Sequence, residues 1–424
     1  MDSNLISEEA QLMETLDLIL TSNADVNIAT TPDGDSPLII AVEKRSINEV
    51  RRLLEVENID LEYKTPEPWC HTALSYSIIF QSQEKCKLLL EKGADVNVRG
   101  RDGFTPLIQA IGLGAEFLQL LIDFGADVNA KSDTDVTPLS NAIQSEFLDE
   151  TICLLANGAD PNLSPSHMNQ IPLLAYTCIY SNYNVSLELM KYGADVNIMY
   201  KNCKLLHLAR HPEVTKALLE AGLHPDCLTA ADNNTPLSIA CFHSLFEVAK
   251  VLLEANANAN HVDDDGDTPL HYATYKNNGD ITQLLLDYGA NPHAVNIYNA
   301  SPVWNAVYRG NIGIVRNFLL RNVDLNVVSR GTKHMKGAGF LFSNPMSLLH
   351  VAVQNNYGDV AELLSQCLCD MNREQWLDGF VPEVSQLDQE HISLYRKMKT
   401  AKDSRSMPSL LRLCSCKDKL LLEG

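Results

Sequence analysis

The sequence predicts an all-α fold: a solenoid of about ten stacked helix pairs joined by short finger turns, followed by a small C-terminal helical tail. The first observation behind this prediction is a tetrapeptide close to Thr-Pro-Leu-His that recurs along the 424-residue chain. Its leucine-class residue returns at intervals of 31 to 36 residues. The nine positions are Leu38, Leu74, Leu107, Leu139, Leu173, Leu206, Leu237, Leu270 and Val303. Such an interval is typical of a stack of like units rather than of one globular core.

A second marker keeps the same interval. Gly-Ala-Asp-Val-Asn occupies residues 93–97, 125–129 and 193–197, and Gly-Ala-Asp-Pro-Asn occupies residues 158–162. Because two markers stay in phase, the repeat is a property of the fold and not of composition. A solenoid grows by stacking, so the length of the chain does not require two or three separate globular domains.

The elements of one unit follow from its residues. Thr268 supplies an N-cap oxygen, and Pro269 stands at the first helical position, where a proline loses no needed donor. Leu270 and Ala273 lie three residues apart and therefore share one helix face. A second helix follows and ends at Gly289, because glycine adopts the left-handed cap without strain.

These residues carry a resemblance to a known family. Residues 268–273 read Thr-Pro-Leu-His-Tyr-Ala and match the ankyrin signature at every specified position. Asp102-Gly103 and Asp265-Gly266 stand where ankyrin repeats place the tight turn of their protruding finger. The chain therefore resembles an ankyrin-repeat protein over roughly residues 20–370. The resemblance implies a binding role for the repeats.

The organisation along the chain follows from where the repeat pattern begins and ends. Residues 1–32 are expected to form an N-terminal capping half-repeat, and residues 33–370 the ankyrin repeats. Residues 371–406 are expected to form a helical linker, with an amphipathic helix at 384–398, and residues 407–424 a separate C-terminal segment.

Two irregularities interrupt the repeats. The unit at 201–226 contains His211-Pro212, and a proline cannot sit in a helix interior, so we expect a clipped first helix and a local change of stack geometry there. The last repeat carries an insertion at 329–346 that is basic and rich in glycine. It is either a tolerated surface loop or an extended finger that contacts a partner.

Composition and charge restrict the partners. Hydrophobic residues make up 45% of the chain, enough for a continuous core, and the net charge is −21. Such a field repels phosphate backbones and anionic membranes, so neither nucleic acid nor a membrane is expected as a partner. No signal peptide or transmembrane stretch is recognisable, and scattered cysteines indicate reduced thiols. A cytoplasmic location is expected, with the nucleus as the alternative.

No catalytic motif is recognisable, and the chain is expected to be no enzyme, with no cofactor, no catalytic residue and no metal. A four-thiolate zinc site is the alternative for two Cys-x-Cys pairs, but the spacing within each pair is shorter than structural zinc usually requires. The pairs are Cys367 with Cys369 and Cys414 with Cys416. His207, His271 and His350 occupy the signature histidine position, where hydrogen bonding between neighbouring fingers is expected. Trp304 replaces that histidine in its repeat and is expected to pack.

The ankyrin resemblance implies where a protein target binds. In ankyrin proteins the finger turns and the residue after the signature histidine project onto the concave side, which we call the finger face. The residues expected there are Trp69, His71, Tyr76, Phe104, Gln109, Tyr272 and Tyr298. Packing between fingers is the alternative role for each aromatic residue, since aromatic side chains also bury large areas in ordinary cores.

The C-terminal segment carries a second resemblance. Residues 408–414 read Pro-Ser-Leu-Leu-Arg-Leu-Cys, which resembles the start of a SOCS box, the segment with which ankyrin repeat and SOCS box proteins bind Elongin B and C. The residues that fit are Ser409, Leu410, Leu413 and Cys414. Asp418 departs from the family's aliphatic residue, and the Leu-Pro-rich cullin segment is missing from the ten residues that follow Cys414. The alternative is a helix that caps the last repeat.

Two functions follow from these resemblances. The first is a substrate-recognition subunit of an Elongin/cullin-type ubiquitin ligase, with a protein target on the finger face. The second is a plain cytosolic ankyrin scaffold or adaptor with no link to a ligase. Binding of Elongin through the tail discriminates between them, because ankyrin stacks serve many partners and the fold does not settle the matter.

Overall fold

The protein is described by a computed structural model that covers residues 25–29, 31, 34–44, 47–180, 183–321, 323–329, 346–366 and 394. Two compact units divide the chain, residues 1–200 and residues 201–424.

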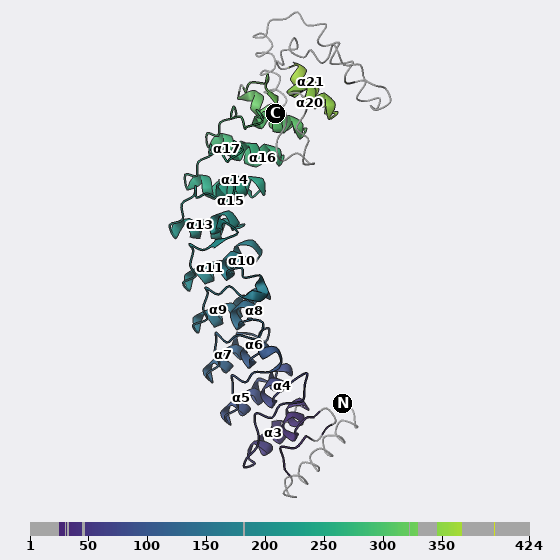
Figure 1. The fold of residues 1–424 in the computed structure, drawn as a ribbon, viewed down its shortest axis with the longest axis vertical. Coiled ribbons are helices and arrows are strands. Elements are labelled where there is room, and N and C mark those ends of the chain that lie inside the picture. Colours follow the sequence, from purple (N-terminus) through teal and green to yellow (C-terminus); the bar gives the residue numbers. More distant parts are fainter. Residues whose placement is uncertain are drawn as a thin grey trace, which may run out of the picture. The chain divides into compact units, whose positions relative to one another are not determined.

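In unit 1 (residues 1–200) the described residues form five helix pairs in chain order. The pairs are α2 (Pro37–Glu43) with α3 (Ile47–Leu54), α4 (Ala73–Ile79) with α5 (Gln83–Glu91), α6 (Pro106–Gln109) with α7 (Ala115–Asp123), α8 (Pro138–Gln144) with α9 (Leu148–Ala156), and α10 (Leu173–Tyr180) with α11 (Tyr183–Lys191). Its short elements are the 3₁₀ turns η1 (Arg101–Gly103) and η2 (Ser166–Met168) and the strand β1 (Met199–Tyr200). The first helices α4, α6, α8 and α10 lie on one side of the unit and the second helices α5, α7, α9 and α11 on the other (Figure 1).

In unit 2 (residues 201–424) five helix pairs lie within the part of the chain that the structure describes. They are α12 (Leu205–Leu208) with α13 (Pro212–Glu220), α14 (Pro236–Phe242) with α15 (Phe246–Glu254), α16 (Pro269–Tyr275) with α17 (Gly279–Asp287), α18 (Pro302–Tyr308) with α19 (Ile312–Leu320), and α20 (Leu348–Gln354) with α21 (Gly358–Gln366). Its strands are β2 (Cys203–Lys204), β3 (Val328–Ser329) and β4 (Met346–Ser347). The predicted all-α repeat solenoid is confirmed, because the strands described are only two residues long.

The first helices begin where the signature predicts. Thr72, Thr137, Thr235 and Thr268 are N-cap residues whose hydroxyls each accept a hydrogen bond from the backbone N–H three residues on. The leucine-class residue of the signature then faces the core, and all nine of these side chains are at most 1% exposed. Burial on this scale between like units is what holds a solenoid together.

The Gly-Ala-Asp-Val-Asn marker forms a ladder of hydrogen bonds between repeats. The Asn97 amide donates to the Gly125 carbonyl (3.0 Å) and accepts from the Asp127 N–H (2.8 Å). The same exchange recurs one repeat later, from Asn129 to Gly158 (3.1 Å) and Asp160 (2.8 Å). The marker is therefore repeated because each asparagine pairs with the backbone of the next copy.

The structure describes the short first helix at 201–226 and the two ends of the insertion at 329–346. Helix α12 has four residues where α14 and α16 have seven, and Pro212 opens α13 at its first turn, so the clipped first helix is confirmed. At the predicted insertion, β3 and β4 pair antiparallel, with Val328 opposite Ser347 and Ser329 opposite Met346. Residues 330–345 between these strands lie outside the described residues.

Most of the predicted terminal segments lie outside the described residues. This holds for residues 1–24 of the capping half-repeat, for the 371–406 linker apart from Leu394, and for the whole 407–424 segment. Leu394, on the predicted 384–398 helix, is helical and buried in the hydrophobic cluster of unit 2.

Candidate protein-binding face

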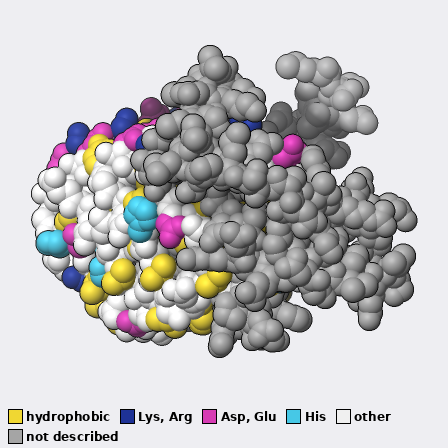
Figure 2. All heavy atoms as spheres, turned by 90° about the horizontal axis from the view of Figure 1, so that it is seen from above, with side chains coloured by type: hydrophobic (Ala, Val, Ile, Leu, Met, Phe, Trp, Pro, Cys, Tyr) yellow, Lys and Arg dark blue, Asp and Glu magenta, His cyan; other side chains and the backbone are white. Residues whose placement is uncertain are grey.

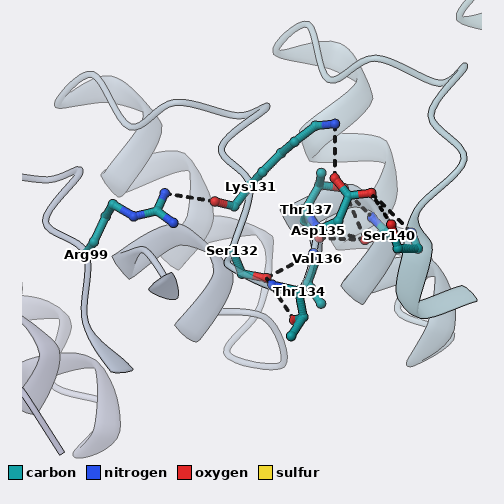
Figure 3. A network of polar contacts seen from close by, with 9 residues as sticks. Arg99, Lys131, Ser132, Thr134, Asp135, Val136, Thr137 and Ser140 are labelled. Carbon is teal, nitrogen blue, oxygen red and sulfur yellow. Dashed lines mark hydrogen bonds and ion pairs between the residues drawn. The ribbon is translucent and has the colours of Figure 1, made fainter. Parts of the chain in front are cut away.

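Polar side chains fix the fingers of unit 1 to one another (Figure 3). The Arg99 guanidinium donates to the Lys131 carbonyl (2.9 Å). It also pairs with Asp133 (2.8 Å) in the next finger. Lys131 in turn pairs with Asp135 (3.0 Å), and this carboxylate accepts from the N–H and hydroxyl of Ser166 one repeat further on (3.1 Å each). Three successive fingers are thus held in a defined arrangement, as a rigid binding face requires.

An exposed tryptophan is the most prominent predicted residue on the finger face. Trp69 is 56% exposed, and the Arg101 guanidinium lies 5.5 Å from its ring centroid. The His71 ring stacks beside it at 6.2 Å. An exposed tryptophan with a cation over its ring is a surface that can anchor a protein partner.

The aromatic contacts continue along α4. His71 meets Tyr76 edge to face at 5.6 Å, and Tyr76 stacks on Phe80 at 6.0 Å. The Tyr76 hydroxyl donates to the Asp35 carboxylate (3.4 Å). Burial and the neighbouring Arg101 charge lower the pKa of His71, so this ring is neutral at pH 7. The structure therefore brings three of the predicted residues together in one row, which also contains Phe80.

Phe104 and Gln109 contribute to the structure of their repeat. Phe104 closes its finger turn, since its N–H donates to the Arg101 carbonyl (3.1 Å) and its carbonyl accepts from the Gly100 N–H (2.9 Å). Gln109 is the last residue of α6 and is half-buried, and its Oε1 atom has no hydrogen-bond partner among the described residues.

In unit 2 the two predicted residues of the finger face differ in their exposure to solvent. Tyr272 is only 4% exposed, and its hydroxyl donates to the Asp263 carboxylate. This position favours the packing alternative and corrects the expectation that Tyr272 is presented to a target. Tyr298 is half-buried in its finger, where its carbonyl accepts from the Ser329 hydroxyl (3.0 Å). The four predicted tail residues, Ser409, Leu410, Leu413 and Cys414, lie outside the described residues.

Two of the three signature histidines, His271 and His207, link neighbouring fingers as predicted. Nδ1 of His271 accepts from the Thr268 N–H (3.0 Å), while its Nε2 donates to the Ala300 carbonyl of the next finger (3.1 Å). Nε2 of His207 likewise lies 3.1 Å from the carbonyls of Cys227 and Asn234. Trp304 is fully buried and stacks on Tyr308 at 5.5 Å, which confirms its packing role.

Several residues on the finger face were not predicted. In unit 1 these are Phe80 and Arg101, and in unit 2 they are Phe242, Tyr275 and Tyr308, the last residues of α14, α16 and α18. The signal that could have found the second group is its spacing, since 242, 275 and 308 are 33 residues apart. These positions are partly exposed and lie outside the signature, so the buried signature residues give no indication of them.

The thiols of the described residues show no reactive site. Burial raises the pKa of Cys86 to about 11 and that of Cys178 to about 12, so both remain neutral thiols. Within the described residues no group of three or more His, Cys, Asp or Glu side chains could hold a metal ion. The two Cys-x-Cys pairs considered for zinc lie outside the described residues. Among the described helices none is long and apolar enough to cross a bilayer.

Models of known protein families match these repeats. A model of ankyrin repeats in three copies matches residues 5–100 and 205–296, and the single ankyrin-repeat model matches residues 102–133. Together they cover about half of the chain. The chain belongs to the ankyrin-repeat proteins.

Three curated proteins illustrate the range of its relatives. E3 ubiquitin-protein ligase KEG of Arabidopsis thaliana is 26% identical over 55% of this chain and 15% of its own length. Alpha-latroinsectotoxin-Lt1a of Latrodectus tredecimguttatus is 33% identical over 23% of this chain and 7% of its own length. Notch-regulated ankyrin repeat-containing protein of Xenopus tropicalis is 32% identical over 20% of this chain and 76% of its own length. The chain thus spans only a small part of the first two relatives.

Proposed function

We propose that this chain is a non-catalytic, protein-binding module that acts as a substrate-recognition subunit of an Elongin/cullin-type ubiquitin ligase. Its finger face binds a protein target, and residues 408–420 recruit Elongin B and C. The complex works in the cytoplasm, with the nucleus as the alternative compartment.

The observation that carries target binding is the exposed row that begins at Trp69. An exposed tryptophan that is held between Arg101 and His71 has few ways to rearrange, so it loses little conformational entropy when a partner covers it. Tryptophan and arginine are also the residue types that dominate binding hot spots. Support for the ligase link is the SOCS-box-like sequence at 408–414 together with the similarity to E3 ubiquitin-protein ligase KEG.

Replacing Trp69 with alanine is expected to weaken target binding by about 2 kcal/mol or more, because the substitution removes a central anchor. Phe124→Ala is the matched control, since Phe124 is an exposed aromatic residue at the C-cap of the second helix α7 and is not part of the row that begins at Trp69. Target recovery from cells is measured by affinity purification and mass spectrometry, with thermal unfolding as the folding check. Equal target recovery by wild type and a folded Trp69→Ala variant would contradict target binding at this row.

The tail has its own test. Leu410 is expected to fill an apolar pocket on Elongin, so its loss costs on the order of 2–4 kcal/mol of binding. The Leu410→Pro/Cys414→Phe variant is compared with wild type for co-purification of Elongin B and C. If wild type recovers no more Elongin than the double variant, the ligase role fails and the scaffold alternative stands. A chain ending at residue 400 should still recover the target while it loses Elongin.

A further inference from the structure

Four basic side chains recur in unit 2 at a constant interval. Arg210, His243, Lys276 and Arg309 are each 33 residues apart. His243, Lys276 and Arg309 are the C-cap residues of α14, α16 and α18, and Arg210 follows the C-cap of α12. Because equivalent positions of stacked repeats lie side by side, the four side chains form one row.

Contacts between neighbouring repeats confirm that the row is continuous. Nη2 of Arg210 lies 3.4 Å from Nε2 of His243. Nζ of Lys276 lies 3.9 Å from the ring centroid of Phe242. The Arg309 guanidinium lies 5.3 Å from the ring centroid of Tyr275. Each of these three contacts joins one repeat to the next.

Aromatic residues precede three of these basic residues in the chain. Phe242, Tyr275 and Tyr308 stand one residue before His243, Lys276 and Arg309, and each is partly exposed. The cation–aromatic row therefore consists of Arg210, Phe242, His243, Tyr275, Lys276, Tyr308 and Arg309. A cation that rests on a ring is held in place by the ring quadrupole and keeps its remaining N–H donors free for a partner.

Three cations of the row form no ion pair with the described residues. Within the described part of the chain none of Arg210, Lys276 and Arg309 has an Asp or Glu oxygen within ion-pair distance, whereas Arg51, Arg99 and Arg321 do. On the part of the face in Figure 2 that is not grey, basic, acidic and hydrophobic side chains all occur. These three cations are thus available to an anionic partner, in a chain whose net charge is −21.

Electrostatics agree with this arrangement. Burial first, and then the charges of Arg210 and Lys276, lower the pKa of His243. Burial also lowers the pKa of Arg210. The charges of Arg210 and Lys276 therefore reach the His243 ring, which is neutral at pH 7, and the Arg210 guanidinium is partly removed from water, a state that a bound anion relieves.

A helix-capping role explains only part of the pattern. A cation at a helix C-terminus interacts favourably with the helix dipole, and this accounts for one basic residue at a time. It does not account for the rings beneath the cations or for the regular interval. In unit 1 the corresponding C-cap residues of α2, α4, α6 and α8 are Lys44, Phe80, Ala110 and Ser145, so the row is absent from these repeats.

We propose that the cation–aromatic row binds an extended, Asp- and Glu-rich segment of a protein target. The proposal rests on the proposed function, because it supplies the chemistry of the target that the finger face would hold. Single cations spread along a row match single carboxylates spread along a peptide, whereas a phosphate dianion is better held by arginines that converge on one point. The rings offer apolar contact between the charges.

The test begins with a random dodecapeptide library displayed on phage and selected on the full-length chain. Selected peptides are expected to be enriched in Asp and Glu, and a labelled copy of the best one is used for fluorescence anisotropy. Lys276→Gln/Arg309→Gln should weaken its binding at least about tenfold, the equivalent of the loss of one good ion pair. The control Lys216→Gln/Lys250→Gln removes the same charge from α13 and α15 in the same unit, and it should change binding less than about twofold.

Three outcomes would overturn the proposal: selected peptides without acidic enrichment, equal losses for the row variant and the control, and tighter binding of a phosphoserine peptide than of its Asp and Glu counterpart. Circular dichroism shows whether each variant is folded, and glutamine keeps a stem of similar length. If Trp69→Ala loses the cellular target while the row variant keeps it, the row proposal fails and the proposed function stands. Loss of Elongin with the tail variant remains independent of both.

Discussion

At the residue scale, the hydrogen bonds of the signature histidine require a neutral imidazole. Nδ1 of His271 must be unprotonated to accept from the Thr268 N–H, and Nε2 must carry the proton that it donates to Ala300. Burial lowers the pKa of His271 to about 4, and burial has the same effect on His350. Protonation would remove the acceptor that caps α16 and would place a charge in the core.

The chain is therefore expected to lose stability as the pH falls below about 6.5, the pKa of an unfolded histidine, and the loss from these groups ends near pH 4. The sign follows because the unfolded state binds the proton first. Between pH 6.5 and pH 5 His271 alone should contribute a loss of about 2 kcal/mol. Urea unfolding at pH 7 and pH 5 measures the difference, which should shrink in His271→Gln. His293→Gln, at an exposed histidine, should keep the wild-type difference; equal differences in both variants would argue against the buried imidazole as the cause.

The residues that the sequence predicted correctly are those whose partners are backbone groups at fixed offsets. The histidines and the capping threonines are of this kind, because the repeat itself supplies the carbonyl or N–H. Tyr272 is of the other kind. Its position after the signature histidine suggested exposure, yet its hydroxyl reaches the Asp263 carboxylate nine residues earlier. A side chain that finds one particular side-chain partner leaves no periodic signal, and so its burial was not visible in the sequence.

At the element scale, the finger turn depends on a backbone that few residues adopt. Gly103 has φ of +72°, and a Cβ atom added there would lie 2.4 Å from Nη2 of Arg99 and 2.5 Å from Oδ1 of Asp133. These are the two groups that join this finger to the next one. The turn and the polar network are thus built around the absence of a side chain.

Gly103→Ala is expected to destabilise unit 1 by roughly 1–3 kcal/mol, because the left-handed backbone is strained by a side chain and the Arg99–Asp133 pair must move. Gly93→Ala separates the two causes, since Gly93 also has a positive φ, +97°, but its Cβ would meet nothing within 4 Å. Chemical denaturation should show the larger loss for Gly103→Ala. Equal losses would mean that backbone strain acts alone and that the finger contacts are unimportant.

At the scale of the whole molecule, the helix pairs of the described residues could be predicted because each repeat carries the same sequence pattern. The signature leucines mark each first helix, and all of them are buried. The contacts between repeats were harder to predict from the sequence. The sequence showed Asn97 and Asn129 as parts of a repeated motif but did not predict their hydrogen bonds to the next repeat. It did not predict the cation–aromatic row of unit 2, because the row consists of exposed positions outside the signature. Both kinds of contact arise from stacking rather than from the residues of one repeat.

A stack that is held by contacts between neighbours should also fail locally. Leu270 is fully buried in α16, within the cluster that contains Val303 of α18 and Leu237 of α14. Leu270→Ala should cost roughly 2–5 kcal/mol, since a buried leucine loses transfer and packing energy together. In a repeat protein this loss spreads mainly to adjacent repeats, because each unit contacts only its neighbours.

Hydrogen exchange followed by mass spectrometry should therefore show the largest loss of protection in α14–α18 and a smaller loss in the helices of unit 1. Leu118→Ala, at a fully buried leucine of α7, is the mirrored variant, and its loss should centre on α4–α9. Each variant serves as the control for the other, because the chemical change is the same and only the repeat differs. If both variants raise exchange to the same extent along the whole chain, the protein unfolds as a single cooperative block, and stability is not a sum over neighbouring repeats.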